Sequence, residues 1–299
     1  MLPSFEYHQV KDIEDAVQLL KKYESDAKII AGGTDVLLQL AHGNIKVNHL
    51  ISLCKVPGLE QLKENDEYII IGANTTHRAV ELSPTVKSKL YALHEAAGQV
   101  GSVQIRNVAT VAGNLCNAAP SADTATPLLV HDALLRVSGS KGERQIKLKE
   151  FYRGPGLTVL NKDEVLKEIL IPKPPLRTAS TYIKHARRKA MDLALIGVSV
   201  YIELDEAYQY FRDVRIALGT LAPTPIRAYQ AEELLKGKPI NEEFIKKSAE
   251  AAGAATSPRT SWRSTGEYRH DMANVLVFRA LNKVLKRIIK SKNQGEGID

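Results

Sequence analysis

Cysteine is scarce in this chain, which holds only Cys54 and Cys116 among its 299 residues. Two thiols exclude a disulfide framework and fit a reducing compartment. They also exclude an iron–sulfur cluster within the chain, because such a cluster normally takes four thiolates. The eight histidines form neither an HExxH pair nor part of a paired CxxC pattern, so we predict no metal site in this chain.

Long apolar runs are missing as well. No stretch approaches the roughly 20 apolar residues of a membrane-spanning helix, so we expect no membrane span. The opening stretch MLPSFEYHQVKDIEDA lacks a basic segment followed by an apolar one. We therefore expect no secretory signal peptide and a cytoplasmic protein.

Acidic residues are absent from the segment 279–292, which carries six of the basic residues behind the net charge of +7. A solvated helix face is the favoured interpretation of such a run. Nucleic-acid binding would need stacking aromatic residues among the basic ones, and only Phe278 lies at the edge. We expect no nucleic-acid partner, and an acidic protein partner remains the alternative.

The chain does contain two small-residue stretches that each lead toward a helical pattern. Residues 28–35, KIIAGGTD, pass from an apolar strand to a predicted helix over 36–41. Residues 109–114, ATVAGN, precede Ser121, a predicted N-cap, and the apolar run 125–135, a predicted helix and strand. Helix N-termini favour phosphate, so two such stretches suggest a dinucleotide held from two sides. Neither stretch has the GxGxxG or P-loop spacing, and a plain strand-to-helix connection remains the alternative.

The hydrophobic pattern predicts an α+β protein with a boundary at Pro172–Pro175, a stiff segment that helices and central strands both exclude. We expect one domain over 1–175 and a second over 176–299, in which strands are followed by helices. The predicted helices are 12–24, 86–100, 228–236, 241–254 and 267–291, and 101–108 is predicted to be extended. The predicted strands are 28–31, 49–53, 68–72, 134–137, 145–148, 165–171, 181–186, 194–204 and 214–221.

No side-chain catalytic group is predicted. Ser121 lies in no GxSxG elbow, and Cys116 has no evident histidine partner. Asp123 could stabilise the first turn of a helix or accept hydrogen bonds from sugar hydroxyls. Composition does not choose between these roles.

Six segments resemble, in the same order, the FAD-binding subunits of bacterial xanthine dehydrogenases, within the medium flavoprotein subunits of molybdenum hydroxylases. The resemblance spans roughly residues 3–290. The segments are KIIAGGTDVLLQL, QIRNVATVAGNLCNAAPSADTATPLL, GPGLTVLNKDEVL, YIKHARRKAMDLALIGVSV, RIALGTLAPTPIRA and SPRTSWRSTGEYR.

The resemblance implies a two-lobed FAD-binding domain, like that of vanillyl-alcohol oxidases, followed by a smaller α+β domain with a three-stranded antiparallel sheet and helices. It also implies that two glycine segments hold the pyrophosphate of FAD and that other residues contact the cofactor elsewhere. The implied cofactor-binding residues are Lys28, Ile29, Ile30, Ala31, Gly32, Gly33, Thr34, Asp35, Ala109, Thr110, Val111, Ala112, Gly113, Asn114, Asp123, Val165, Ile183 and Lys184.

The resemblance further implies an oxidoreductase subunit that takes electrons from an iron–sulfur subunit and passes them to NAD. A large molybdopterin subunit would oxidise the substrate, and a small subunit would carry two-iron two-sulfur clusters, in a dimer of heterotrimers. The purine-oxidising branch is favoured. The alternatives are the flavin subunit of a carbon monoxide, aldehyde or N-heterocycle dehydrogenase, a non-catalytic flavin- or nucleotide-binding regulator, and a free-standing flavin oxidase.

Overall fold

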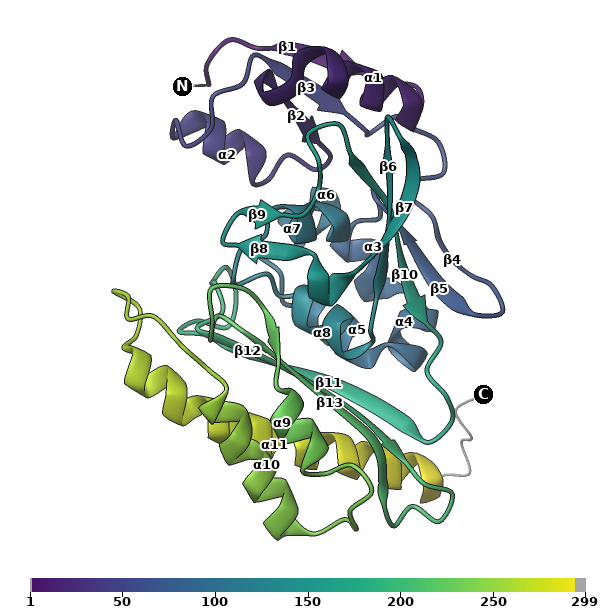
Figure 1. The fold of residues 1–299 in the computed structure, drawn as a ribbon, viewed down its shortest axis with the longest axis vertical. Helices are drawn as coiled ribbons and strands as arrows, with labels where there is room; N and C mark the ends of the chain where they lie inside the picture. The colour runs from purple at the N-terminus through teal and green to yellow at the C-terminus, as the bar shows by residue number, and fades with distance from the viewer. Residues whose placement is uncertain (1, 294–299) are drawn as a thin grey trace. The chain divides into compact units, whose positions relative to one another are not determined.

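A computed structural model describes residues 2–293 of the chain (Figure 1). Close contacts divide the chain into two compact units. Unit 1 comprises residues 1–79, 103–118 and 133–172, and unit 2 comprises 80–102, 119–132 and 173–299. The division into domains 1–175 and 176–299 stays a prediction. Within residues 2–293, no helix is both long and apolar enough to span a membrane.

Unit 1 begins with a small parallel sheet in the order β1-β3-β2. Its helix α1 is amphipathic, and Asp12 caps it by accepting a hydrogen bond from the Asp15 amide at 2.7 Å. The elements are β1 (Glu6–Gln9), α1 (Ile13–Tyr23), a 3-10 turn (Glu24–Asp26), β2 (Ala27–Ile30), α2 (Val36–Ala41) and β3 (His49–Ser52). Helix α1 and strands β2 and β3 match the predicted elements at 12–24, 28–31 and 49–53, whereas β1 was not predicted.

A five-stranded antiparallel sheet completes unit 1, in the order β4-β5-β10-β6-β7. The predicted strands 134–137 and 145–148 form the hairpin of β6 and β7, and Pro155 and Gly156 form the turn between the short strands β8 and β9. The elements are β4 (Leu62–Glu64), β5 (Tyr68–Gly72), α6 (Val103–Val108), α7 (Val111–Cys116), β6 (Leu134–Gly139), β7 (Gly142–Lys147), a 3-10 turn (Leu148–Glu150), β8 (Tyr152–Gly154), β9 (Leu157–Thr158) and β10 (Val165–Pro172). Helix α3 (His77–Leu82) runs from unit 1 into unit 2.

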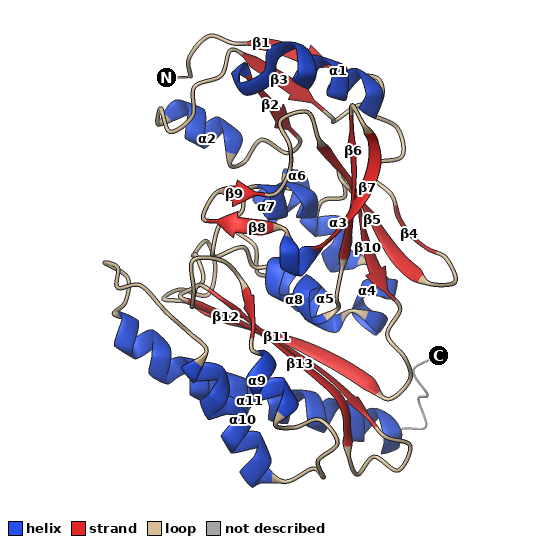
Figure 2. Ribbon diagram, in the orientation of Figure 1, coloured by secondary structure: helices blue, strands red, loops and turns tan. Residues whose placement is uncertain are grey.

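Unit 2 is an antiparallel sheet with helices against both faces (Figure 2). A two-residue strand, β14, extends the three expected strands. The strands are β11 (Thr178–His185), β12 (Ile196–Leu204), β13 (Phe211–Gly219) and β14 (Ile226–Arg227). The helices are α4 (Pro84–Lys89), α5 (Tyr91–Ala97), α8 (Ala125–Val130), α9 (Tyr229–Glu233), α10 (Glu242–Ala254) and α11 (Gly266–Asn293).

The central strand β12 explains why both faces are covered. Val198, Val200 and Ile202 are fully buried in the core that includes α10 and α11. The alternate residues face the other way, and the Ser199 hydroxyl donates to Thr126 of α8 at 3.0 Å. Side chains alternate along a strand, so one strand supplies both cores.

Three sequence predictions are wrong. The single helix 86–100 is broken at Leu90, which has φ −127° and ψ 52°, into α4 and α5. Residues 103–108 are helical rather than extended, because the turn at Gly101 (φ 47°) starts a helix in which Arg106 is buried. Ser121 does not cap α8, since Thr124 precedes it without a side-chain cap.

Candidate functional site

The first glycine segment leaves β2, turns at Gly33 and enters α2. Gly33 has a φ of 71°, a region that L side chains rarely adopt. Within residues 2–293, the backbone N–H groups of Gly32, Gly33 and Thr34 donate no hydrogen bond to another protein group. Burial raises the pKa of the Asp35 carboxyl above its ordinary value. The turn therefore presents backbone donors and one partly desolvated carboxyl.

The second segment, 109–114, is a loop only over its first two residues. From Val111 onward it is the short helix α7, capped by Thr110, whose hydroxyl accepts from the Gly113 amide at 3.0 Å. A β-carbon at Gly113 would lie 2.9 Å from the Thr110 hydroxyl oxygen, so glycine at this position leaves room for the cap. The segment is anchored to residues 75–77, since the His77 amide donates to the Ala109 carbonyl at 3.0 Å.

The two segments meet inside unit 1. A β-carbon on Gly32 would lie 1.9 Å from the carbonyl oxygen of Val108 and 2.9 Å from the Cα of Ala109. Glycine at position 32 is thus what lets the two backbones touch. Gln39 of α2 adds a second link, because its side-chain amide donates to the Asn117 side chain after α7 at 2.8 Å.

Asp123 and Lys184 form a buried ion pair in unit 2. The Lys184 ammonium donates to Asp123 Oδ2 at 2.9 Å, and the Tyr182 hydroxyl donates to Asp123 Oδ1 at 2.6 Å. The side chains of Asp123 and Lys184 are only 9% and 6% exposed. Burial raises the pKa of Asp123, and the Lys184 charge opposes that rise. Lys184 also donates to the Gln99 carbonyl at 3.0 Å, so the cluster joins residues from three separate stretches of the chain.

The other two predicted residues, Ile183 and Val165, make their contacts outside the cluster of Asp123 and Lys184. Ile183 packs against the core shared by the sheet of unit 2 and helices α10 and α11. Val165 is 2% exposed at the start of β10 in unit 1, opposite Ser138 of β6. Both lie in strands that pair within the sheet of their own unit.

Tyr182 is a residue that the sequence analysis missed. It shares a strand face with Lys184, since the two are separated by one residue in β11. The predicted strand 181–186 therefore contained the signal. Burial raises the pKa of Tyr182 well above its ordinary value, and the nearby Asp123 carboxylate adds to the rise.

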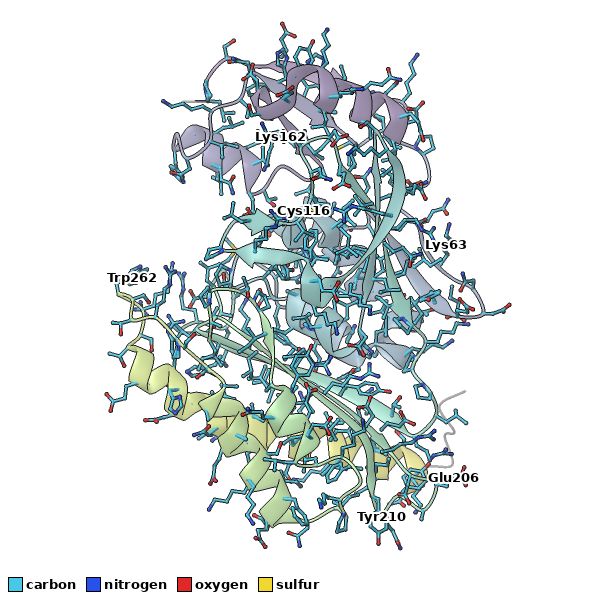
Figure 3. All side chains as sticks on the ribbon, viewed as in Figure 1. Lys63, Cys116, Lys162, Glu206, Tyr210 and Trp262 are labelled. Atoms are coloured by element: carbon cyan, nitrogen blue, oxygen red, sulfur yellow. The ribbon has the colours of Figure 1, made fainter. Side chains whose placement is uncertain are left out.

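Cys116 ends α7 and is labelled in Figure 3. Desolvation raises the pKa of its thiol to about 12, with Lys28 opposing the rise. A thiol with such a pKa is protonated at neutral pH and is a poor nucleophile. Cys116 is therefore no candidate nucleophile, in line with its lack of an evident histidine partner.

Comparisons with known proteins bear on the whole chain. Residues 3–174 match the family described as the FAD binding domain in molybdopterin dehydrogenase. Residues 181–284 match the CO dehydrogenase flavoprotein C-terminal domain. The chain belongs to the FAD-binding subunits of the molybdenum hydroxylase family.

Named relatives match between 82% and 96% of the length of this FAD-binding subunit. It is 35% identical over 281 residues to the xanthine dehydrogenase FAD-binding subunit of Escherichia coli O157:H7, covering 93% of this chain and 95% of the relative. Against a solved structure of carbon monoxide dehydrogenase from Hydrogenophaga pseudoflava, the TM-score is 0.93 at 33% identity, covering 96% of this chain and 99% of the other. It is also 33% identical over 248 residues to the nicotinate dehydrogenase FAD-subunit of Eubacterium barkeri, covering 82% of this chain and 83% of the relative. The family makes this FAD-binding subunit part of an oxidoreductase.

Proposed function

We propose that residues 28–35 and 109–114 hold the pyrophosphate of one FAD. The contact of the two segments at Gly32 is the observation that carries this proposal. The unused N–H groups of Gly32, Gly33 and Thr34 are the kind of donors that a phosphate group requires. The residues present therefore fit the cofactor.

We extend the proposal to the four remaining residues that the resemblance singled out. Asp123 would accept hydrogen bonds from the ribityl or adenosine hydroxyls, with Lys184 holding its carboxylate in place at 2.9 Å. Val165 and Ile183 would supply apolar contacts. No catalytic acid or base is assigned, because this chain's part is to grip, orient and shield the cofactor.

We also propose the place of this subunit in electron transfer. When bound, FAD would supply the redox chemistry that links an iron–sulfur subunit to NAD as the electron acceptor, and this chain would hold and orient the cofactor. The protein is then one part of a cytoplasmic complex with a large molybdopterin subunit and a small iron–sulfur subunit, in a dimer of heterotrimers. Purine oxidation by the large subunit is the favoured activity. The likeness of this chain to the carbon monoxide dehydrogenase structure keeps carbon monoxide oxidation as the second candidate.

The flavin site is tested by a matched pair of glycine variants. Gly33 and Gly43 have φ values of 71° and 70°, so Gly→Val strains the backbone alike at both. A β-carbon on Gly43 meets nothing within 4 Å, whereas one on Gly33 lies 3.2 Å from side chains of Ile30 and Leu37. We expect G33V to purify without flavin and G43V to keep a full complement. Equal flavin content in two folded variants would contradict the assignment.

The electron-transfer proposal is tested by anaerobic titration of the flavin-loaded chain with NADH. We expect bleaching of the yellow colour, electron transfer to an artificial dye, and no oxidation of any purine. Purine oxidation by the metal-free chain would overturn the proposed division of labour. A flavin that NADH does not reduce would exclude NAD as the acceptor and leave the flavin site standing.

The proposed partners are tested by purification from the native source. A lasting complex usually buries more than about 1,000 Å² of surface, so the subunits should survive purification together. Mass analysis should then find three chains with molybdenum and iron. A lone chain without either metal would contradict the proposal.

A further inference from the structure

Three potential metal ligands converge on the parallel sheet of unit 1. Glu6 and His8 are two residues apart in β1, so their side chains lie on the same face. His49 of β3 is the register partner of Glu6 across the parallel pair. Neighbouring strands lie about 4.8 Å apart, which brings the three side chains within reach of a common point.

The separations of the three donor atoms fit one metal ion. His8 Nε2 and His49 Nδ1 are 3.0 Å apart and share a hydrogen bond, whose proton a bound metal ion would displace. Glu6 Oε2 lies 3.6 Å from His8 Nε2 and 3.4 Å from His49 Nδ1. Tetrahedral zinc, with ligands at about 2.0–2.1 Å, sets its ligand atoms about 3.4 Å apart. The three atoms thus form a triangle of the size of one face of a zinc tetrahedron.

We propose that Glu6, His8 and His49 bind a divalent transition metal ion such as Zn²⁺. Two imidazole nitrogens and one carboxylate oxygen favour zinc, nickel or copper over magnesium or calcium, which prefer oxygen ligands. The site belongs to unit 1 and shares no residue with the proposed flavin contacts.

The surroundings of His49 orient its ring before any metal binds. The ring of Tyr23, at the end of α1, stacks on it with centroids 3.6 Å apart and an interplanar angle of 17°. The Asp26 carboxylate lies behind it, 3.9 Å from Nε2, the nitrogen that faces away from the other ligands. Asp26 is itself fixed, because the Asn48 amide N–H and side chain donate to it at 3.0 and 3.2 Å. At 3.9 Å the Asp26 carboxylate makes no hydrogen bond to the ring and contributes only a nearby negative charge, so the stack on Tyr23 is what fixes the ring plane.

The site has room for a further ligand on its outer side. The Glu6 side chain is 70% exposed, whereas those of His8 and His49 are 21% and 14% exposed. Three protein ligands with one open position are typical of sites whose metal exchanges or meets an outside ligand. Figure 1 shows β1 and β3 side by side next to α1, so the ligands rest on regular elements.

No metal site was expected from the sequence, because no local spacing of ligand residues marks this cluster. Two ligands are separated by one residue, and the third follows 41 positions after His8. The three ligands are brought together only by the pairing register of β1 with β3.

The test uses the full flavin-loaded chain, treated with chelator and then titrated with ZnCl₂ by calorimetry. CoCl₂ serves as a second probe, since its absorption reports tetrahedral nitrogen and oxygen ligation. We expect one ion per chain in the unmodified protein. H8N, H49N and E6Q should each weaken binding at least tenfold, and H8N/H49N should abolish it. H42N is the matched control, because His42 is exposed after α2 and outside the cluster.

Folding of each variant is monitored by circular dichroism. E6Q should fold even if the histidine variants do not, because the Glu6 side chain is the most exposed of the three ligands. Zinc should also raise the thermal midpoint of the unmodified chain and of H42N, but not that of H8N/H49N. Binding of zinc by H8N/H49N as strongly as by the unmodified chain would overturn the proposal, as would the absence of stoichiometric binding.

Discussion

The carbonyl oxygen of Val108 occupies the space that a side chain on Gly32 would need, 1.9 Å from the ideal β-carbon position. This backbone-to-backbone contact joins the turn after β2 to the approach to α7. The two segments are nearly eighty positions apart in the chain. A contact of this kind tolerates no methyl group, because the atoms that the methyl group would meet all belong to the main chain and cannot swing aside.

We therefore expect Gly32→Ala to separate the two segments. Overpacking of this kind usually costs about 1–3 kcal/mol of unfolding free energy, and flavin content should fall as well. Gly154→Ala is the control, because a β-carbon there meets only Leu157 Cδ1 at 3.8 Å. Flavin absorbance per chain and urea unfolding would be measured for both. A G32A protein with normal flavin content and stability would show that the contact is not needed.

The buried pair of Asp123 and Lys184 leads to a second prediction. Asp123→Ala leaves an ammonium group that is 6% exposed without its carboxylate, and breaking a buried pair costs about 3–5 kcal/mol. The double variant D123N/K184M removes both charges and should recover much of the lost unfolding free energy, as measured by urea unfolding. If the double variant were no more stable than D123A, the cost would come from packing or from Tyr182 rather than from the unpaired charge.

Two buried histidines predict a loss of stability in mild acid. Burial, with a smaller effect of Arg106, lowers the pKa of His77 to about 4. Burial, with a smaller effect of Arg215, lowers the pKa of His131 to about 3. Below the ordinary pKa of 6.5 the unfolded chain binds these protons and the folded chain does not, so stability is full above pH 6.5 and falls as the pH drops.

Well below pH 6.5, each histidine should lower the free energy of unfolding by roughly 1.4 kcal/mol for every pH unit of acidification. Urea unfolding between pH 6.5 and 5 would measure it before most carboxylates titrate. His77→Gln should remove the contribution of His77 and leave only that of His131 in the pH dependence of the unfolding free energy. A flat profile in that window would contradict the burial of both rings in neutral form.

Arg227 supports a fourth prediction. Its guanidinium donates to Glu232 twice, from Nε at 2.6 Å and Nη2 at 2.8 Å, and Nη1 reaches the Leu129 carbonyl at 3.0 Å. Lysine cannot make this forked contact, so Arg227→Lys should cost about 2 kcal/mol or more. Arg212→Lys is the control, since Arg212 is 63% exposed in its pair with Glu203 and should change stability by less than about 1 kcal/mol. Equal thermal midpoints for the two variants would refute the distinction.

The sequence predicted the elements whose periodicity is strong. Helix α1 was expected at 12–24. Strands β10 to β13 match predicted strands in which apolar residues alternate with polar ones or run continuously. Short helices were harder, because a six-residue helix such as α6 contains too few turns to show a period. Its Val103, Ile105 and Val108 favour strands, and the tertiary burial of Arg106 decides otherwise.

The candidate site was predictable where its residues are contiguous. The segment 28–35 contains its own strand, turn and helix start, so local pattern was sufficient. The partners of Asp123 were not predictable, because they depend on how β11 lies against residues 99 and 123. The cluster of Glu6, His8 and His49 depends likewise on strand register, which no local pattern specifies.

The interleaving of the two units bears on how the chain emerges from the ribosome. Residues 80–102 and 119–132 are translated before the strands β11 to β13 that α5 and α8 cover. Their apolar faces therefore leave the exit tunnel without a surface to cover, while the later segments of unit 1 are still being made. A nascent chain in this condition is prone to aggregate and is a natural client for chaperones. A truncated product ending at residue 175 would keep that exposure permanently.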